Sequence, residues 1–309
     1  MRILVVGAGA TGGFYGAKLA RAGHDVTFLV RPRRAEALRA RGLRLLGPGD
    51  AEDVLAPRLV TADALAEPYD VVLLSVKALA LKRAVEDVAP AIGPGTAVVP
   101  LLNGMAHLDE LNARHGADRV LGGVAKCVTT VNAEGDIVVL APLAVLEVGE
   151  QGGGAASERV AALRAALTGA GVESPETADV VGAMWAKWVF ITSASAVTCL
   201  LRAPVGDVVA VPGGADFARA VVAEGAAVAA AAGHPVARGE LDFTLGVLTQ
   251  ERSPFATSMY RDVADGHQVE VEHVFGDLLL RARALGVATP LLDTATLYLR
   301  VHQHRVSGG

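Results

Sequence analysis

Cysteine is scarce in this sequence, which contains only Cys127 and Cys199 among its 309 residues. The two are far apart and form no CxxC pair, so a disulfide framework and a cysteine-rich zinc site are excluded. The eight histidines show no metal-ligand spacing, and we expect His302 and His304 to be solvated. We therefore predict no metal site. Isolated thiols fit a reducing compartment, which favours a cytoplasmic location.

Charge is limited as well. Charged residues make up 20% of the chain, the formal net charge is −5, and 52% of the residues are hydrophobic. This balance gives no electrostatic reason to expect nucleic acid or an anionic membrane surface as a partner. The apolar content is ample for a large core, so intrinsic disorder is not expected.

Long apolar runs without a charge are also rare. Residues 180–201 have the length of a membrane span, but they contain Lys187 together with several Ser and Thr residues. A charge within a span is costly in lipid, so we interpret this segment as a buried helix of a soluble protein. At the other end, Met1 and Arg2 lead directly into a strand pattern, without the apolar region and cleavage site of a secretory signal.

What the sequence does contain is a strand–turn–helix–strand pattern at its start. Residues 2–6 form the short apolar run of a buried parallel strand, and GAGATGG follows at once. A helical pattern then runs to about Ala22, where Gly23 fits the end of a helix. Residues 25–30 have the pattern of a second strand. These features predict a βαβ unit.

The alternation continues through the first half of the chain and then stops. Further strands are expected near 70–76, 96–100, 119–125, 136–140 and 145–148. From about residue 179 the pattern is helical, with helices expected at 180–201, 215–232, 240–250, 267–285 and 290–304. The sequence therefore predicts an α/β fold of two domains: a Rossmann domain with a doubly wound parallel sheet over 1–177, and an all-helical domain over 178–309.

The segment GAGATG between the first strand and the first helix matches the GxGxxG pattern of dinucleotide-binding turns. Gly7 permits the tight turn, Gly9 lets a pyrophosphate approach the backbone, and Gly12 allows the helix to pack closely on the strand. The helix start at Ala10 and Thr11 offers backbone N–H groups and a positive dipole end to phosphates. We therefore predict a dinucleotide cofactor.

The end of the second strand indicates which dinucleotide. An NAD enzyme usually carries Asp or Glu there, which binds the ribose hydroxyls and would repel a 2′-phosphate. This chain has VRPRR at 30–34 and no acidic residue between Val26 and Ala35. Arg31 can bind a 2′-phosphate through two hydrogen bonds. We predict NADP(H) as the cofactor; the alternative is that these arginines lie in a solvated loop.

Lys187 stands among apolar neighbours, in the segment MWAKWVF. Burying an ammonium without a partner is costly, so this side chain is expected to line a polar cavity. A protonated lysine there can donate its proton to a carbonyl oxygen as a general acid. The alternative is a lysine that reaches solvent from an amphipathic helix. Glu270, on the margin of the apolar face expected for the helix 267–285, can face a cleft or can be an ordinary surface glutamate.

Five segments, in this order along the chain, resemble the ketopantoate reductase (2-dehydropantoate 2-reductase) family. They are the GAGATGG turn, Ser75-Val76-Lys77, Leu102-Asn103-Gly104-Met105, Trp185-Ala186-Lys187, and Thr257-Ser258-Met259-Tyr260-Arg261-Asp262 followed by Glu270. The resemblance implies a Rossmann domain followed by a helical domain, with NADPH as the usual cofactor and a 2-keto acid as substrate.

The resemblance also implies residue roles. Lys187 would be the general acid, Glu270 would bind the distal hydroxyl of the substrate, and Ser258 would contact its carboxylate. Asn103 would lie between the nicotinamide ribose and the substrate. The residues implied for the cofactor are Gly7, Gly9, Ala10, Thr11, Gly12, Arg31, Lys77 and Asn103.

The sequence departs from the family in the helix that contains Lys187. The family typically has asparagines one and two helical turns later, where this chain has Ile191 and Ser195. Either other groups such as Thr192 or Thr198 replace them, or the substrate is a more apolar keto compound than ketopantoate.

Two further alternatives stay open. A non-catalytic dinucleotide sensor would need the glycine turn but neither Lys187 nor Glu270. The apolar helices of the second half fit either a homodimer interface or the core of their own domain.

Overall fold

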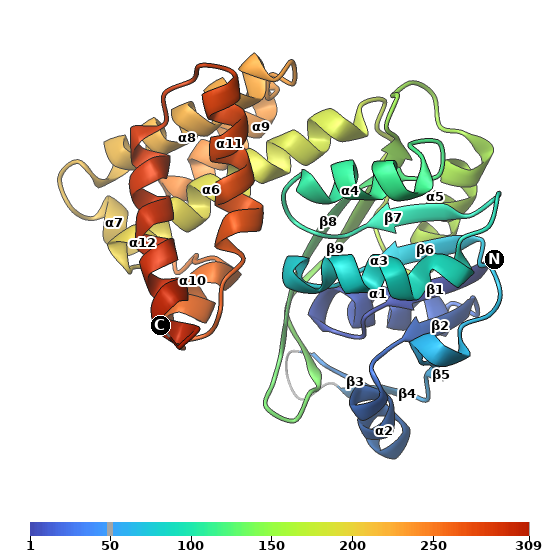
Figure 1. Cartoon of the computed structure of the whole chain (residues 1–309). Helices are drawn as coiled ribbons and strands as arrows, with labels where there is room; N and C mark the ends of the chain where they lie inside the picture. Colours follow the sequence, from blue (N-terminus) through green and yellow to red (C-terminus); the bar gives the residue numbers. More distant parts are fainter. Residues whose placement is uncertain (48–51, 309) are drawn as a thin grey trace. The chain divides into compact units, whose positions relative to one another are not determined.

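A computed structural model describes residues 1–47 and 52–308 of the chain, which form two compact units (Figure 1). Unit 1 comprises Met1–Leu102 and His107–Val180. Unit 2 comprises Asn103–Ala106 and the chain from Val181 onward. The first unit contains parallel strands with helices, and the described elements of the second unit are helical, so the predicted α/β class is confirmed.

A five-stranded parallel sheet forms the centre of unit 1, in the order β5-β2-β1-β6-β7. Its strands are β1 (Arg2–Val6), β2 (Asp25–Leu29), β5 (Arg58–Val60), β6 (Val71–Leu74) and β7 (Ala97–Pro100). From β1 the chain proceeds to β2 and β5 on one side, whereas β6 and β7 lie on the other side. The strand order thus reverses beside β1, and ligands of open α/β sheets bind at such a point, beyond the carboxyl ends of the strands.

A second sheet of four strands, in the order β4-β3-β9-β8, completes unit 1. It contains β3 (Leu43–Leu46), β4 (Glu52–Leu55) and a long antiparallel hairpin of β8 (Leu121–Val131) and β9 (Ile137–Glu150). The strands expected near 136–140 and 145–148 are one continuous strand, β9. The short strands β3, β4 and β5 were not predicted, because their few residues show no clear apolar pattern.

The helices of unit 1 alternate with its strands. They are α1 (Ala10–Arg21), α2 (Pro32–Arg41), α3 (Leu81–Val88), α4 (Ala106–His115) and α5 (Glu158–Gly169), with short 3-10 turns at Ala62–Ala64, Ala78–Ala80 and Ala89–Ala91. The first, α1, was predicted, whereas α2 was not. Gly23 follows α1 with φ of 89°, as expected of a glycine at a helix end.

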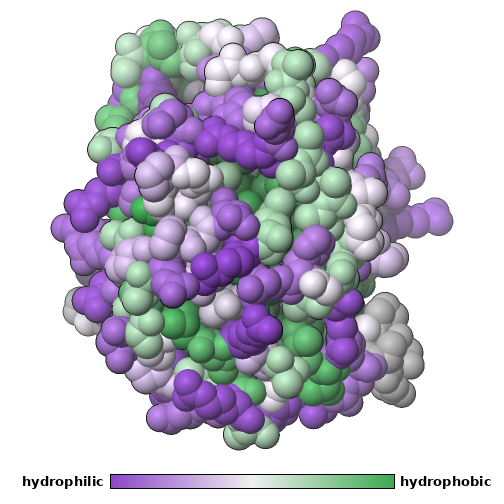
Figure 2. All heavy atoms as spheres, turned by 90° about the vertical axis from the view of Figure 1, so that its right-hand side faces the viewer, coloured by the Kyte–Doolittle hydropathy of each residue, from purple (hydrophilic) through white to green (hydrophobic). Residues whose placement is uncertain are grey.

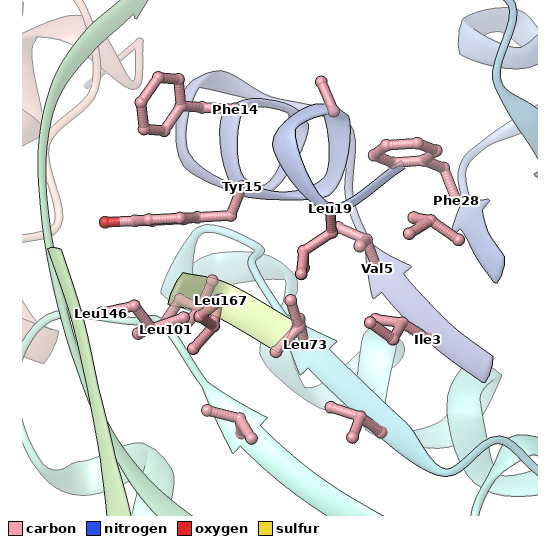
Figure 3. Close-up of a cluster of buried hydrophobic side chains, with 14 of the residues drawn as sticks. Ile3, Val5, Phe14, Tyr15, Leu19, Phe28, Leu73, Leu101, Leu146 and Leu167 are labelled. Atoms are coloured by element: carbon pink, nitrogen blue, oxygen red, sulfur yellow. The ribbon is translucent and has the colours of Figure 1, made fainter. Parts of the chain in front are cut away.

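The core of unit 1 lies between α1 and the strands (Figure 3). Phe14, Tyr15 and Leu19 of α1 meet apolar side chains of the parallel sheet such as Val5 and Leu73, all almost fully buried. Each such buried side chain contributes about 1.5–3 kcal/mol through loss of contact with water. The hydroxyl of Tyr15 donates a 2.6 Å hydrogen bond to the Val145 carbonyl oxygen, so burial of this polar group is compensated.

Unit 2 is built from helices. They are α6 (Val180–Leu201), α7 (Val205–Val209), α8 (Gly214–Ala231), α9 (Arg238–Leu248), α10 (Ser258–Ala264), a π-helical turn η5 (Glu272–Gly276), α11 (Asp277–Ala284) and α12 (Pro290–Val306). The sequence pattern missed α7 and α10, which are too short to show a helical period. The helix expected over 267–285 begins later, because residues 267–270 are not helical.

The long helix α6 is apolar enough to cross a membrane by length and composition, but 67% of its apolar window is buried inside the protein. Its polar residues Thr192, Ser193, Ser195 and Thr198 are fully buried. Thr192 and Thr198 donate hydrogen bonds to carbonyl oxygens of the preceding helical turn. These are the properties of a core helix, as the sequence predicts.

Hydrophilic and apolar side chains alternate on the face of the molecule that Figure 2 draws. Large exposed apolar side chains do occur on both units, such as Leu79, Phe243, Leu280 and Leu297. Single apolar residues on a surface are ordinary and carry no assignment by themselves.

Candidate functional site

The glycine turn begins directly after β1. Gly7 has φ of 97°, a conformation that side chains rarely tolerate, and its N–H donates to the Leu29 carbonyl at the end of β2. A Cβ on Gly12 would lie 2.3 Å from the Gly7 carbonyl oxygen and 2.8 Å from Cβ of Ser75. Gly12 is therefore required for the close packing of α1 against the turn and against the residue that follows β6.

Gly9 differs from these two glycines. A Cβ added to Gly9 would meet no heavy atom of the described chain within 4 Å, and the residue is exposed. Gly9 is also the N-cap of α1, with no side-chain cap hydrogen bond and no acidic residue in the first turn. The open space and the N–H groups of the helix start, at Ala10 and Thr11, fit the approach of a phosphate.

Two basic residues from the predicted cofactor site lie at the same edge of the parallel sheet. Arg31 follows β2, is exposed and is the N-cap residue of α2. Lys77 follows β6, is exposed and precedes the 3-10 turn at Ala78. Since parallel neighbouring strands end at one edge, the structure brings the glycine turn, Arg31 and Lys77 to the carboxyl edge of the sheet.

Arg34 belongs to the same edge and was not singled out from the sequence. Its Nη2 donates hydrogen bonds to the carbonyl oxygens of Ala8, in the glycine turn, and Gly135, in the turn between β8 and β9. The side chain is half-buried, and burial lowers its pKa, whereas the charge of Asp136 opposes that shift. The sequence offers no sign of this contact, because Gly135 lies 101 positions further along the chain.

In unit 2, Lys187 is half-buried on α6, next to the fully buried Trp188. The indole Nε1–H of Trp188 donates a 2.8 Å hydrogen bond to the carbonyl oxygen of Val274, inside the π-helical turn η5. Single π-helical turns are often found at functional sites. This bond ties the helix that contains Lys187 to the segment that follows Glu270.

Ser195 makes a structural contact. Its hydroxyl donates to Thr257 Oγ1 at 3.3 Å, and the same oxygen accepts the backbone N–H of Tyr260 as the N-cap of α10. Thr198 lies 3.4 Å from this oxygen and donates its own proton to the Ala194 carbonyl. The cluster fixes the start of α10, and therefore Ser258, its exposed first residue, on α6.

The proposed replacements for the missing asparagines do not fit. The hydroxyl protons of Thr192 and Thr198 are used within α6, and both residues are fully buried. Ile191, one turn after Lys187, is half-buried and has an apolar side chain. On this face of α6, the structure therefore places no amide where the family typically has one.

Glu270 does not lie on a helix, so this part of the prediction is wrong. It is the residue before the helical segment, and its carbonyl oxygen accepts the N–H of Val274. Two contacts from α12 hold the segment before Glu270. Gln303 Oε1 accepts the N–H of Val269, and His302 Nε2 lies 2.8 Å from the His267 carbonyl oxygen. His302 is thus half-buried and bonded, not solvated as expected.

Asn103 lies in the short piece of chain that belongs to unit 2. A Cβ on the neighbouring Gly104 would lie 2.9 Å from the carbonyl oxygen of His273, in the π-helical turn. The loop around Asn103 therefore packs against the segment that follows Glu270. Within unit 2, the structure gathers the loop of Asn103, the helix of Lys187 and the segment of Glu270 around the same π-helical turn.

Within the described ranges, 1–47 and 52–308, no group of three or more His, Cys, Asp or Glu side chains could hold a metal ion. The chemistry that the arrangement offers consists of backbone N–H groups and arginines for an anionic cofactor, and a lysine with polar side chains in the helical unit.

Comparison with known proteins covers nearly the whole chain. Residues 3–152 match the family described as Ketopantoate reductase PanE/ApbA, and residues 179–303 match its C-terminal domain. "Uncharacterized oxidoreductase YkpB" of Bacillus subtilis (strain 168) is 31% identical over 303 residues, which cover 98% of this chain and 99% of that protein. A 2-dehydropantoate 2-reductase of Mesorhizobium japonicum is 30% identical and covers 97% of both chains.

Solved structures agree. A PanE/ApbA family ketopantoate reductase from Ralstonia eutropha JMP134 superposes with a TM-score of 0.88 at 26% identity, over 99% of this chain and 100% of that one. D-mandelate dehydrogenase, solved with NADH and anilino(oxo)acetate, has the same TM-score at 19% identity, over 99% and 100% of the two chains. The latter likeness shows the fold alone. Since both halves match, this chain is a member of the ketopantoate reductase family of oxidoreductases.

Proposed function

We propose that this protein reduces a 2-keto acid with NADPH, and that 2-dehydropantoate (ketopantoate), reduced to pantoate, is the first substrate to test. The observation that carries the proposal is the match of both halves of the chain to the family, combined with the glycine turn and Arg31 at one edge of the sheet. In this proposal residues 1–177 bind the dinucleotide, and residues 178–309 bind the substrate and contribute the catalytic side chains.

NADPH is favoured over NADH by charge at the end of β2. Arg31 is exposed there, and no acidic residue lies between Val26 and Ala35 to repel a 2′-phosphate or to bind free ribose hydroxyls. The residues that hold the cofactor in this proposal are Gly7, Gly9, Ala10, Thr11, Gly12, Arg31, Lys77 and Asn103. An Arg31→Ala variant should lose most of its preference for NADPH, measured as the ratio of KM values for NADPH and NADH. An unchanged ratio would contradict this assignment.

When bound, NADPH supplies the hydride that the carbonyl carbon accepts. Lys187 Nζ donates a proton to the keto oxygen, so the product is a hydroxy acid and the charge on oxygen is neutralised as it develops. Support comes from the half-buried position of Lys187, which is the one charged residue of α6, beside the buried Trp188. Glu270 binds and orients the distal hydroxyl, Ser258 contacts the carboxylate, and Asn103 lies between cofactor and substrate.

A second substrate class is favoured by the same helix. Ile191 cannot accept or donate a hydrogen bond, and the hydroxyl of Ser195 is engaged with Thr257. A keto acid with an apolar side chain would suit this face better than ketopantoate, whose hydroxyl needs a polar partner. The likeness in fold to D-mandelate dehydrogenase shows that this architecture also serves an aromatic hydroxy acid.

The deciding experiment is NADPH oxidation by the purified protein with ketopantoate and with a panel of apolar and aromatic 2-keto acids and ketones. Turnover of ketopantoate with the highest kcat/KM supports the first substrate. Saturable turnover of an apolar keto acid alone supports the second class. Turnover of none of them, while NADPH still binds, would leave a dinucleotide sensor as the better function.

We further propose a cytoplasmic location and a homodimer built on the apolar helices of unit 2. Sedimentation of the purified protein at several concentrations tests the homodimer, and a monomer at every concentration would refute it.

A further inference from the structure

Arg34 connects two segments that lie far apart in the sequence. Its Nη2 lies 3.2 Å from the carbonyl oxygen of Ala8 and 2.8 Å from that of Gly135. Hydrogen bonds from a charged donor are about twice as strong as those between neutral groups. The half-buried guanidinium is thus part of the framework around the glycine turn, unlike its exposed neighbour Arg33.

The turn between β8 and β9 is itself firmly held. Arg41 Nη1 donates to the Glu134 carbonyl oxygen at 2.6 Å, and Arg41 Nη2 lies 3.0 Å from Asp136 Oδ2. Arg44 of β3 approaches the same carboxylate at 3.6 Å, and Asp136 is only 7% exposed. These contacts join helix α2, β3 and this turn, and Arg34 links the three to Ala8.

The bond to Ala8 determines the orientation of a neighbouring amide. The carbonyl of Ala8 and the N–H of Gly9 belong to one planar peptide group, and in a trans peptide they point in opposite directions. Because the carbonyl oxygen is held by Arg34, the N–H of Gly9 points away from Arg34. Gly9 is exposed, and nothing of the described chain lies near the direction of its missing side chain.

We propose that Arg34 is a positioning residue for the diphosphate of the dinucleotide: through the Ala8 carbonyl it fixes the peptide group that presents the Gly9 N–H. This inference rests on the proposed dinucleotide binding and goes beyond it. Arg34 acts through the backbone of the turn and not on the 2′-phosphate. Its loss therefore affects NADPH and NADH alike, whereas loss of Arg31 affects NADPH alone.

The test measures dissociation constants of NADPH and of NADH, by nucleotide fluorescence or calorimetry, for the wild type and for matched arginine variants. Arg34→Ala should weaken binding of both nucleotides by about tenfold, the loss expected for one charge-assisted hydrogen bond. Arg33→Ala removes an equal charge from the same helix at an exposed position and should leave both constants unchanged. Arg34→Lys should restore part of the affinity, because an ammonium can still donate to Ala8.

Arg41→Ala separates positioning from a general loosening of α2, β3 and the turn. It removes bonds to Glu134 and Asp136 but leaves the bond to Ala8, so it should lower Tm while both dissociation constants stay within about twofold of the wild type. Equal loss of nucleotide affinity in Arg34→Ala and Arg41→Ala would overturn the role of the Ala8 bond.

Two other results would also overturn the inference. Unchanged constants in Arg34→Ala would show that Arg34 has no part in nucleotide binding. Loss of NADPH affinity alone would make Arg34 a ligand of the 2′-phosphate. If Arg34→Ala does not fold, Arg34→Met, which keeps an alkyl side chain but removes the donor to Ala8, decides by the same criteria. A wild type that binds neither nucleotide would instead remove the proposed function itself.

Discussion

The candidate functional groups of the two units differ in kind. In unit 1 the glycine turn presents backbone N–H groups; its shape depends on the absence of side chains at Gly7 and Gly12, and Gly9 leaves open space beside it. In unit 2 the candidate groups are side chains, such as Lys187 and Glu270, on segments held by long-range contacts. A site formed by backbone N–H groups is thus determined by one short segment of the sequence. A site formed by side chains depends on how distant segments pack together.

The largest expected effect tests unit 2. Lys187→Ala should lower kcat by about 10²- to 10⁴-fold, the usual contribution of a general acid, while the affinity for NADPH stays unchanged. Steady-state kinetics and nucleotide titration measure the two quantities. Lys82→Ala, an exposed lysine of α3, is the matched control and should retain full kcat. Equal kcat in both variants would show that Lys187 is not the proton donor.

The next effect tests unit 1 by adding one methyl group at two positions. Gly12→Ala places a Cβ 2.3 Å from the backbone oxygen of Gly7, which cannot rotate away, so unfolding should become easier by about 3 kcal/mol. Gly9→Ala meets open space and should cost less than about 1 kcal/mol in stability, but it should weaken nucleotide binding. Denaturant unfolding and nucleotide titration of both variants provide the measurement. Similar stability of the two would contradict this division between packing and binding.

A smaller effect concerns the contact between α6 and the π-helical turn. Trp188→Phe removes the indole donor to the Val274 carbonyl and should destabilise the protein by about 0.5–1.5 kcal/mol, the usual net contribution of one hydrogen bond. Trp185→Phe, where the ring stacks on His234, is the control and should cost less. A larger loss of stability for Trp185→Phe, in thermal or denaturant unfolding, would argue against the importance of this bond.

The smallest effect is a pH dependence within unit 1. The hydrogen bond from Arg159, helped by Ser157, holds the pKa of Glu150 below its usual value, although burial opposes the shift. This contribution to stability is complete above the pKa of an unfolded glutamate, and it is lost as pH falls through the lower folded value. Glu150→Gln should therefore show a shallower loss of Tm on acidification than the wild type. Parallel Tm profiles would contradict this.

The same difference explains which features could be predicted from the sequence. The βαβ start and the glycine turn were predicted, because each depends on neighbours within a few residues. The contact of Arg34 with Gly135 and the bond from Trp188 to Val274 join residues 101 and 86 positions apart, and no local pattern reports them.

The prediction that Glu270 lies on a helix was wrong for a related reason. The apolar residues near Glu270 follow a helical period. Contacts from Gln303 and His302 of α12 nevertheless hold residues 267–269 outside the helix. Ser195 was noted as a departure from the asparagine that is typical of the family, and its bond to Thr257 shows that a hydroxyl at this place stabilises the fold. Local propensity gave the helix, and tertiary hydrogen bonds decided where it begins.

The assignment of Asn103–Ala106 to the helical unit has a practical consequence for anyone who wishes to cut this protein in two. A recombinant fragment that starts near Val181 would lack the loop that contacts His273 in the π-helical turn. A fragment that reproduces the whole unit must include residues 103–106, joined to the helices through a linker. The helical unit is therefore compact in space but is not one continuous segment of the sequence.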